Sequence, residues 1–224
     1  MKISVILPAK NEAEGLARTL PKLRALLPEA QIIVVDDGST DETATVGRQY
    51  GALVLSTPYS MGNGAAIKRG AREAAGDVLV FMDADGQHDP NDIEQLIEPI
   101  EKGEADVVIG SRRQNSEGIP TSRRLAHWIA DLVTYLLFGI WTTDSQSGLR
   151  AFSYEAASRI HITTNGMEVS SEIVAETARN RLRYTEVPIR AIYTDYSMSK
   201  GQGLKVGLRT LGKLLLAKVQ KGAL

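Results

Sequence analysis

The segment from Asp83 to Gln87 carries the clearest chemical pattern of the chain, because two carboxylates and an amide recur there at every second position. Carboxylate and amide oxygens suit hard cations such as Mg²⁺ and Mn²⁺. The pattern follows an apolar run, residues 77–82, that is typical of a buried strand. Asp83, Asp85 and Gln87 are therefore predicted to hold a divalent metal ion. The alternative is an acidic turn that caps the helix after Asp89.

Three other apolar runs also end in polar residues. Parallel strands that alternate with helices bring their carboxyl ends to one edge of a sheet, and ligands bind there. The polar residues after these runs are therefore expected to face one shared crevice. They are Pro8, Asn11 and Glu12 after the first run, Asp36 and Asp37 after the second, and Arg112 and Arg113 after the last.

Asp36 and Asp37 place two carboxylates next to each other in the sequence. A carboxylate here can accept hydrogen bonds from a nucleobase or a ribose. The alternative is that the acidic residues serve the N-terminus of the next helix, where negative charge is favourable. That alternative accounts for Asp41 and Glu42 but leaves Asp36 and Asp37 unexplained.

Apolar runs alternate with helical patterns through the first 110 residues. Strands rich in Val and Ile on both faces, separated by helices, predict an α/β fold with a mostly parallel sheet and helices on both faces. Ser39 followed by Glu42 predicts a capping box that opens the second helix. The predicted strands are residues 3–7, 31–35, 52–56, 77–82, 106–109, 150–152 and a segment around 183–193, and the predicted helices include residues 14–27, 64–75 and 90–101.

The composition excludes several classes of protein. The chain has 224 residues, enough for one domain or one domain with an added element. It has no cysteine, which excludes a disulfide framework, a thiolate nucleophile and a cysteine-type metal site. Its 26 basic and 27 acidic residues give a net charge of −1, which disfavours nucleic acid as a partner.

The last 25 residues differ from the rest in charge. Residues 200–224 contain six basic residues and no acidic one, and residues 203–221 place leucines along one helical face. A basic amphipathic helix of this kind can lie on a membrane surface. The alternative is an ordinary helix packed on the domain or on a second copy. Residues 125–141 are predicted to form a second interfacial helix or a buried core helix.

No signal-peptide pattern opens the chain, and its longest apolar stretch is too polar to span a bilayer. We therefore expect a cytoplasmic protein that is peripheral at the cytoplasmic face of the membrane.

Five segments together resemble a known family, the family 2 inverting glycosyltransferases of the GT-A (Rossmann-like) fold. The resemblance is closest to the dolichyl-phosphate mannose or glucose synthases and their bacterial polyprenyl-phosphate relatives, and it covers roughly residues 1–200. The segments are PAKNE at 8–12, VDDGSTDET at 35–43, MDADGQHDP at 82–90, GSRR at 110–113 and DSQSGLRAF at 144–152.

The resemblance implies transfer of a sugar from a nucleoside-diphosphate sugar to a polyprenyl phosphate, with Mg²⁺ or Mn²⁺ as cofactor. It assigns residues 1–110 to the nucleotide-sugar-binding half and residues 111–200 to the acceptor half of one domain, which the basic amphipathic helix predicted at residues 201–224 follows. The nucleotide pocket would comprise Pro8, Asn11, Glu12, Asp36 or Asp37, and a closing loop with Ser199 and Lys200. The metal on the diphosphate would be held by Asp83, Asp85 and Gln87. The other positions implied to act on phosphate, sugar or acceptor are Arg112, Arg123, Asp144 and Glu172.

Two positions depart from the resemblance. Relatives carry an arginine shortly before Ser199, where this chain has TDYSM at residues 194–198, and many have serine where this chain has His127. The hold of the closing loop on phosphate and the acceptor contacts are therefore expected to differ from those of the mannose synthases. Tyr196 can stack or form a hydrogen bond in place of the arginine.

The nucleophile decides which residues the reaction needs. A phosphate monoester has a second pKa of about 6, so it attacks without losing a proton and needs only positive charge to hold it. Arginines 112, 113, 123 and 124 can supply that charge, unless they form a solvated loop face. A sugar or protein hydroxyl would instead require a general base, for which Asp144 is the candidate.

Other functions remain as alternatives. They are a soluble family 2 transferase acting on a sugar or protein hydroxyl, an inactive nucleotide-sugar-binding partner, and a subunit that serves a separate membrane protein. A nucleotidyltransferase is disfavoured because residues 8–12 lack a glycine-rich basic loop. A dehydrogenase is disfavoured because residues 62–64 lack the third glycine of a dinucleotide fingerprint, and they indicate a tight turn with close helix packing.

Overall fold

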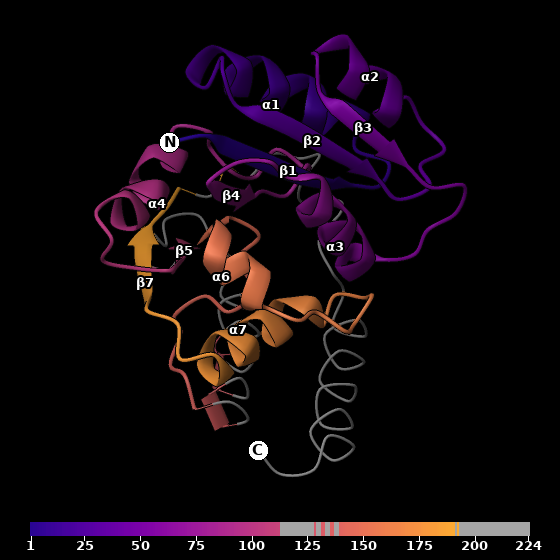
Figure 1. Ribbon diagram of the computed structural model, residues 1–224. Coiled ribbons are helices and arrows are strands. Elements are labelled where there is room, and N and C mark those ends of the chain that lie inside the picture. Colours follow the sequence, from indigo (N-terminus) through magenta and orange to yellow (C-terminus); the bar gives the residue numbers. More distant parts are fainter. Residues whose placement is uncertain (113–127, 129–130, 133–134, 137–138, 191, 193–224) are drawn as a thin grey trace.

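The computed structural model describes residues 1–112, 128, 131–132, 135–136, 139–190 and 192 (Figure 1). Within this part of the chain, seven strands form one sheet in the order β3-β2-β1-β4-β6-β5-β7. The strands are β1 Ile3–Ala9, β2 Gln31–Asp36, β3 Leu53–Ser56, β4 Val78–Phe81, β5 Val107–Ser111, β6 Arg150–Ser153 and β7 Tyr184–Pro188. Only β6 among them runs antiparallel to its neighbours, which confirms the predicted mostly parallel sheet.

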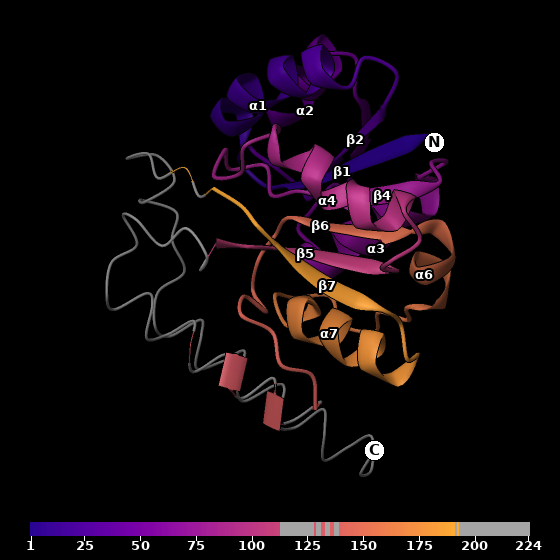
Figure 2. The same cartoon turned by 90° about the vertical axis from the view of Figure 1, so that its left-hand side faces the viewer.

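Helices cover both faces of this sheet, as predicted. Alternate strand residues point to opposite faces, so Val5 and Leu7 join one core with α1 (Ala13–Leu26) and α4 (Asp92–Glu101). Ile6 joins the other core with α3 (Asn63–Glu73) and α7 (Val169–Arg179). Figure 2 shows β6, β5 and β7 side by side, with α7 beneath them. The helices are α1 Ala13–Leu26, α2 Thr43–Gln49, α3 Asn63–Glu73, α4 Asp92–Glu101, α6 Tyr154–Arg159 and α7 Val169–Arg179.

The predicted capping box at the second helix is wrong. Helix α2 begins at Thr43, and its N-cap residue Glu42 makes no side-chain capping bond. The Ser39 hydroxyl instead accepts a hydrogen bond from the backbone N–H of Asn11, at 2.9 Å. Ser39 therefore binds the loop after β1, whereas the sequence pattern predicted that it would cap its own helix.

The reversed direction of β6 brings a distant segment to the ligand-binding edge of the sheet. Arg150 opens β6 and pairs in register with Phe81 near the end of β4 and with Ile109 in β5. The residues just before Arg150 therefore lie at the carboxyl ends of the parallel strands. This position places the DSQSG segment beside the loop that follows β4.

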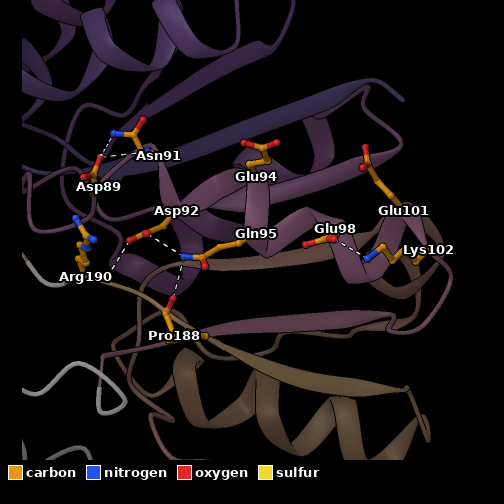
Figure 3. Close-up of a pocket in the computed structure, with 10 residues that line it drawn as sticks. All are labelled: Asp89, Asn91, Asp92, Glu94, Gln95, Glu98, Glu101, Lys102, Pro188 and Arg190. Carbon is orange, nitrogen blue, oxygen red and sulfur yellow. Dashed lines mark hydrogen bonds and ion pairs between the residues drawn. The ribbon is translucent and has the colours of Figure 1, made fainter.

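The chain that leaves β7 is tied to the start of α4 (Figure 3). The Asp92 carboxylate accepts a hydrogen bond from the backbone N–H of Arg190 at 2.9 Å, and Gln95 donates to the carbonyl of Pro188 at 2.8 Å. The backbone N–H of Ile192 donates to the carbonyl of Gln87 at 2.8 Å. The loop after β4 is therefore anchored from the far end of the described chain.

A groove of about 810 Å³ runs along α4 (Figure 3). Five carboxylates and two cations line it, together with Asn91, Gln95 and Pro188. Its negative charge is unfavourable for a diphosphate, so we do not place the donor there. No helix in the described ranges combines the length and apolar character needed to cross a bilayer.

Candidate active site

The loops after β1 and β2 are joined by hydrogen bonds. The Asn11 side-chain oxygen accepts a hydrogen bond from the backbone N–H of Thr40 at 2.8 Å, and the backbone N–H of Glu12 donates to the hydroxyl of Thr43 at 2.8 Å. Asn11 has a φ of 55°, in the left-handed region that asparagine tolerates better than most residues. The structure thus brings together the first two predicted parts of the nucleotide pocket, with Pro8 half-buried at the end of β1.

Asp36 and Asp37 are both buried and both bind backbone N–H groups. Asp36 accepts a hydrogen bond from the backbone N–H of Ser39 at 3.0 Å. Asp37 accepts bonds from the backbone N–H groups of Met61 at 2.6 Å and Gly62 at 2.9 Å. These contacts fix the loop between β3 and α3 against the turn after β2. At least Asp37 therefore shapes the edge of the predicted pocket.

The predicted tight turn before α3 is confirmed. Gly62 has a φ of 104°, which side chains other than glycine rarely adopt. A Cβ on Gly64 would lie 2.5 Å from the carbonyl oxygen of Thr164, so the helix start packs directly on the segment before α7. Glu172 in α7 holds that segment by accepting hydrogen bonds from Thr163 and Thr164.

Glu172 was expected on the sugar and acceptor side, and the structure shows its carboxylate engaged with this loop. Burial acts to raise the pKa of Glu172, but the bonds from the two threonines outweigh it and leave the pKa below its ordinary value.

The three residues predicted to hold a metal lie together in the loop after β4 and are half-buried. The Asp85 carboxylate accepts a hydrogen bond from the backbone N–H of Gln87 at 2.9 Å. Burial and the nearby charge of Asp83 raise the pKa of Asp85 to about 6. Burial acts in the same direction on Asp83, but His88 and the guanidinium groups of Arg112 and Arg150 outweigh it and lower the pKa of Asp83.

These residues fit a divalent ion that a diphosphate helps to bind. Two neighbouring carboxylates repel each other, and a cation between them removes that repulsion. Within the described ranges, no three acidic, histidine or cysteine side chains are placed to hold an ion by themselves. Mg²⁺ and Mn²⁺ sites of phosphate-transferring enzymes commonly combine one or two carboxylates with substrate phosphates. Asp83, Asp85 and the Gln87 amide match that arrangement.

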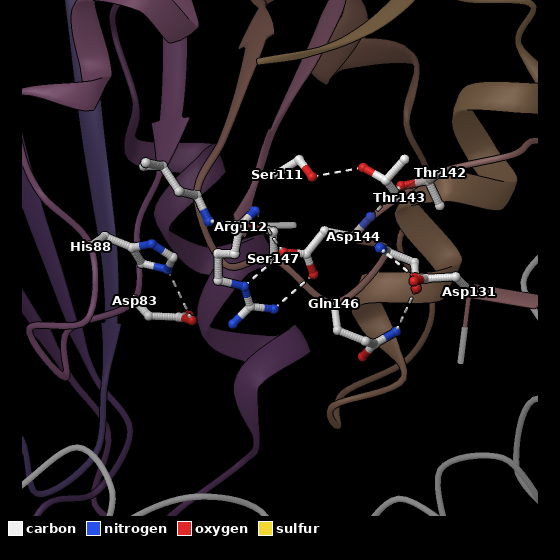
Figure 4. Close-up of polar contacts among 12 residues, drawn as sticks. Asp83, His88, Ser111, Arg112, Asp131, Thr142, Thr143, Asp144, Gln146 and Ser147 are labelled. Atoms are coloured by element: carbon white, nitrogen blue, oxygen red, sulfur yellow. Dashed lines mark hydrogen bonds and ion pairs between the residues drawn. The ribbon is translucent and has the colours of Figure 1, made fainter. Parts of the chain in front are cut away.

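Two residues predicted to be catalytic form one buried ion pair (Figure 4). Arg112 donates from Nε and Nη2 to the two carboxylate oxygens of Asp144, both at 2.7 Å. The side chains are only 11% and 1% exposed. A bidentate pair fixes the guanidinium plane as well as its position. In the view of Figure 4 the Arg112 side chain lies between Asp83 and Asp144.

Arg150 is a site residue that the sequence analysis missed. Its guanidinium is buried and donates to the carbonyl of Ser145 at 2.8 Å. Burial lowers its pKa to about 10, which still leaves it charged at neutral pH. The available signal was a charged residue at the start of an otherwise apolar strand, directly after DSQSG. A charged residue at the start of a strand does not by itself show at which edge of the sheet its side chain lies.

His88 was also missed, although it stands in the resembling segment. Its ring is buried, and Nε2 lies 3.6 Å from the Asp83 carboxylate. Several predicted residues lie outside the described ranges. They are Arg113, Arg123, Arg124, His127, Tyr196, Ser199, Lys200, most of residues 125–141 and the whole basic segment 201–224.

Comparison with known proteins supports the resemblance seen in the sequence. A family model described as "Glycosyl transferase family 2" matches residues 4–161. The UDP-N-acetylglucosamine--dolichyl-phosphate N-acetylglucosaminyltransferase of Methanococcus voltae is 32% identical, over 98% of this chain and 97% of the relative. The undecaprenyl-phosphate mannosyltransferase of Micrococcus luteus is 35% identical, over 92% of this chain and 90% of the relative.

Solved structures agree on the fold. Glucosyl-3-phosphoglycerate synthase from Mycobacterium tuberculosis, in complex with Mn²⁺, UDP and glucosyl-3-phosphoglycerate, superposes with a TM-score of 0.73. The match covers 97% of this chain and 79% of that one, at 25% identity. The same synthase in complex with phosphoglyceric acid gives a TM-score of 0.77 at 24% identity.

Proposed function

Because this chain belongs to glycosyl transferase family 2 and is therefore a glycosyltransferase, we propose that it transfers a sugar from a nucleoside-diphosphate sugar to a polyprenyl phosphate. The donor would bind at the edge formed by the loops after β1, β2 and β4. The acceptor phosphate would approach from the side of Arg112. The names of the relatives from Methanococcus voltae and Micrococcus luteus support a polyprenyl-phosphate acceptor.

The observation that carries the choice of acceptor is the pairing of Arg112 with Asp144. A hydroxyl acceptor would need a base, and Asp144 could serve only by giving up a buried bidentate ion pair. A phosphate acceptor needs no base, because it is largely ionised at neutral pH. It needs a fixed positive charge, and Asp144 holds the Arg112 guanidinium in one orientation.

The proposed reaction is a single displacement. An oxygen of the acceptor phosphate attacks the anomeric carbon of the sugar while the bond from that carbon to the diphosphate oxygen breaks. The nucleoside diphosphate leaves with the electron pair of that bond. A divalent ion held by Asp83, Asp85 and Gln87 would stabilise the negative charge that develops on the leaving group. Mn²⁺ in the synthase from Mycobacterium tuberculosis supports a metal of this kind.

The donor site is tested by thermal unfolding of the full chain with UDP, GDP and CDP, each with and without Mn²⁺. A ligand at 100 times its Kd adds about 2.7 kcal/mol to the free energy of unfolding. We expect one nucleotide to stabilise the wild type in a metal-dependent manner and to lose the metal-dependent part in Asp85→Ala. No response to any nucleotide would contradict catalysis by this chain alone, and would favour an inactive partner or one subunit of a complex.

The acceptor is tested by offering three compounds with the donor identified in that way. They are a polyprenyl phosphate in detergent micelles, phosphoglyceric acid and a simple sugar. Product from the polyprenyl phosphate supports the proposal. Product from phosphoglyceric acid, which the synthase from Mycobacterium tuberculosis binds, would favour a soluble acceptor. Product from the sugar alone would favour a hydroxyl acceptor and a base.

We also propose that the chain works at the cytoplasmic membrane surface, held there by residues 201–224. The six basic residues of positions 200–224 support this proposal. Sedimentation with vesicles of anionic lipid tests it. The wild type should sediment, and a triple variant Lys205→Glu, Arg209→Glu and Lys213→Glu should remain in solution. If the wild type and the variant sedimented to the same extent, the basic residues would not hold the chain on the membrane, and a role of this segment in packing would be favoured.

A further inference from the structure

Gly148 lies directly against the Asp83 carboxylate. A Cβ on Gly148 would be 1.9 Å from Oδ2 of Asp83 and 2.2 Å from its Cγ. Both distances are far below any van der Waals contact, so a residue with a side chain at position 148 would displace the carboxylate or the turn itself. The Asp83 carboxylate can therefore occupy its position only because Gly148 has no side chain.

The turn around Gly148 is held on several sides. The backbone N–H of Ser145 donates to the Asp131 carboxylate at 2.9 Å, and the carbonyl of Ser145 accepts from Arg150 at 2.8 Å. The carbonyl of Leu149 accepts from the backbone N–H of Gly110 in β5 at 2.9 Å. Because the turn is tied to the sheet, Asp83 is the group that would move if position 148 carried a methyl group.

His88 bounds the Asp83 carboxylate with its ring. The histidine side chain is 1% exposed, and its Nε2 lies 3.6 Å from Oδ2 of Asp83. The other ring nitrogen is buried and has no hydrogen-bond partner in the described part of the chain. The ring is thus enclosed, and the polar contact it offers is directed at Asp83. Figure 4 shows the two side chains facing each other.

We propose that Gly148 and His88 are positioning residues that together hold the Asp83 carboxylate in the orientation required to bind the divalent ion. The inference depends on the proposed metal-dependent function. Beyond that function, the inference states that the affinity for the metal is set partly by the turn around Gly148. This turn lies in the second half of the chain and neighbours the Asp144–Arg112 pair.

The test is the binding of Mn²⁺ to the full chain, measured by electron paramagnetic resonance of free Mn²⁺ in the presence of UDP, GDP or CDP, whichever stabilises the chain in the unfolding test. We expect Gly148→Ala to weaken Mn²⁺ binding at least about tenfold, the range typical of residues that orient metal ligands. Metal-free nucleotide binding, measured by calorimetry, should stay unchanged. Unchanged Mn²⁺ affinity in Gly148→Ala would overturn the inference.

Gly70→Ala is the matched control. A Cβ on Gly70 in α3 would lie 2.3 Å from Cγ2 of Ile6, so this variant also meets a close contact, but in the core rather than at Asp83. It should lower the free energy of unfolding and leave Mn²⁺ affinity unchanged. If Gly70→Ala weakened Mn²⁺ binding as much as Gly148→Ala does, the effect would be general and the inference would fail.

A double-mutant cycle isolates the contact with Asp83. Gly148→Ala should destabilise the wild type and have a much smaller effect in an Asp83→Ala background, because the group it displaces is absent. Equal destabilisation in both backgrounds would contradict a contact between the two residues. This measurement uses unfolding only, so it tests the contact even if Gly148→Ala is too unstable for metal binding.

His88 is tested by two variants of different chemistry. His88→Leu fills the space without a polar atom and should weaken Mn²⁺ binding, whereas His88→Gln places a nitrogen near the position of Nε2 and should recover part of it. Wild-type affinity in both variants would overturn the role of His88. Failure of the wild type to bind Mn²⁺ with UDP, GDP or CDP would instead refute the proposed function, and the inference with it.

Discussion

The two sides of the candidate active site are held together by different interactions. On the side of β1 and β2, carboxylate and amide oxygens bind backbone N–H groups, as Asp37 does for Met61 and Gly62. On the side of β5 and β6, long charged side chains are buried against one another, as Arg112 and Asp144 are. The first arrangement fixes the shape of loops, and the second fixes the position of charge.

This difference fits the two proposed ligands. A nucleotide is recognised by a pocket of defined shape, which loops tied by backbone hydrogen bonds provide. A phosphate acceptor requires a guanidinium of fixed orientation, and the bidentate pair with Asp144 fixes the orientation of Arg112. Variants on the two sides should therefore differ in which quantity they change. Four predictions test this, the first on the rate of transfer and the others on the free energy of unfolding, these from the largest effect to the smallest.

Asp85→Ala should lower the rate of sugar transfer by at least about a hundredfold, because the charge on the leaving diphosphate loses its main compensation. The measurement is transfer to polyprenyl phosphate at saturating donor. Asp77→Asn is the control, since Asp77 precedes β4 at the opposite end and binds the backbone N–H of Lys2. Similar rates in Asp85→Ala and in the control would remove the metal from the mechanism.

Asp144→Asn should lower the free energy of unfolding by about 3–5 kcal/mol, because it leaves a buried guanidinium without its charged partner. The comparison is Asp106→Asn, which breaks a pair with Arg183, whose side chain is 58% exposed. An exposed pair contributes little to the free energy of unfolding, because water screens its charges. Urea unfolding of both variants measures the contrast. Equal losses would contradict the view that buried charge holds this side of the site.

Asp37→Asn should lower the free energy of unfolding by about 1–3 kcal/mol, because part of the hydrogen bonding to Met61, Gly62 and Ser60 is lost. The loop before α3 should loosen, so nucleotide affinity should fall while the rate at saturating donor stays close to that of the wild type. A variant that instead loses rate at unchanged affinity would show that Asp37 acts on the reaction and not on the pocket.

The raised pKa of Asp85, about 6, predicts a specific pH dependence in the metal-free protein. Between pH 4 and pH 6 the folded state holds this proton more tightly than the unfolded chain does. The free energy of unfolding of the wild type, relative to Asp85→Asn, should therefore decrease as the pH rises through this window. Urea unfolding in the presence of a chelator measures it. A difference that increases with pH would mean that the pKa of Asp85 is lowered.

The sequence alone determined the larger part of the fold and the local motifs. The predicted strands lie within two residues of β1 to β5, because buried parallel strands appear as apolar runs between helical patterns. The loop from Asp83 to Gln87 was identified for the same reason, since its residues are neighbours in the chain and directly follow an apolar run.

Only the tertiary structure decided which distant residues meet. The direction of β6 follows from its pairing with β4 and β5, and no local pattern in residues 150–153 encodes it. That direction places Arg150 and Gly148 beside Asp83. Likewise, Ser39 binds Asn11, 28 positions away, in place of the local capping partner that the pattern predicted. Periodicity reports which face of an element is buried, whereas partners far apart in the chain are chosen by how the elements pack.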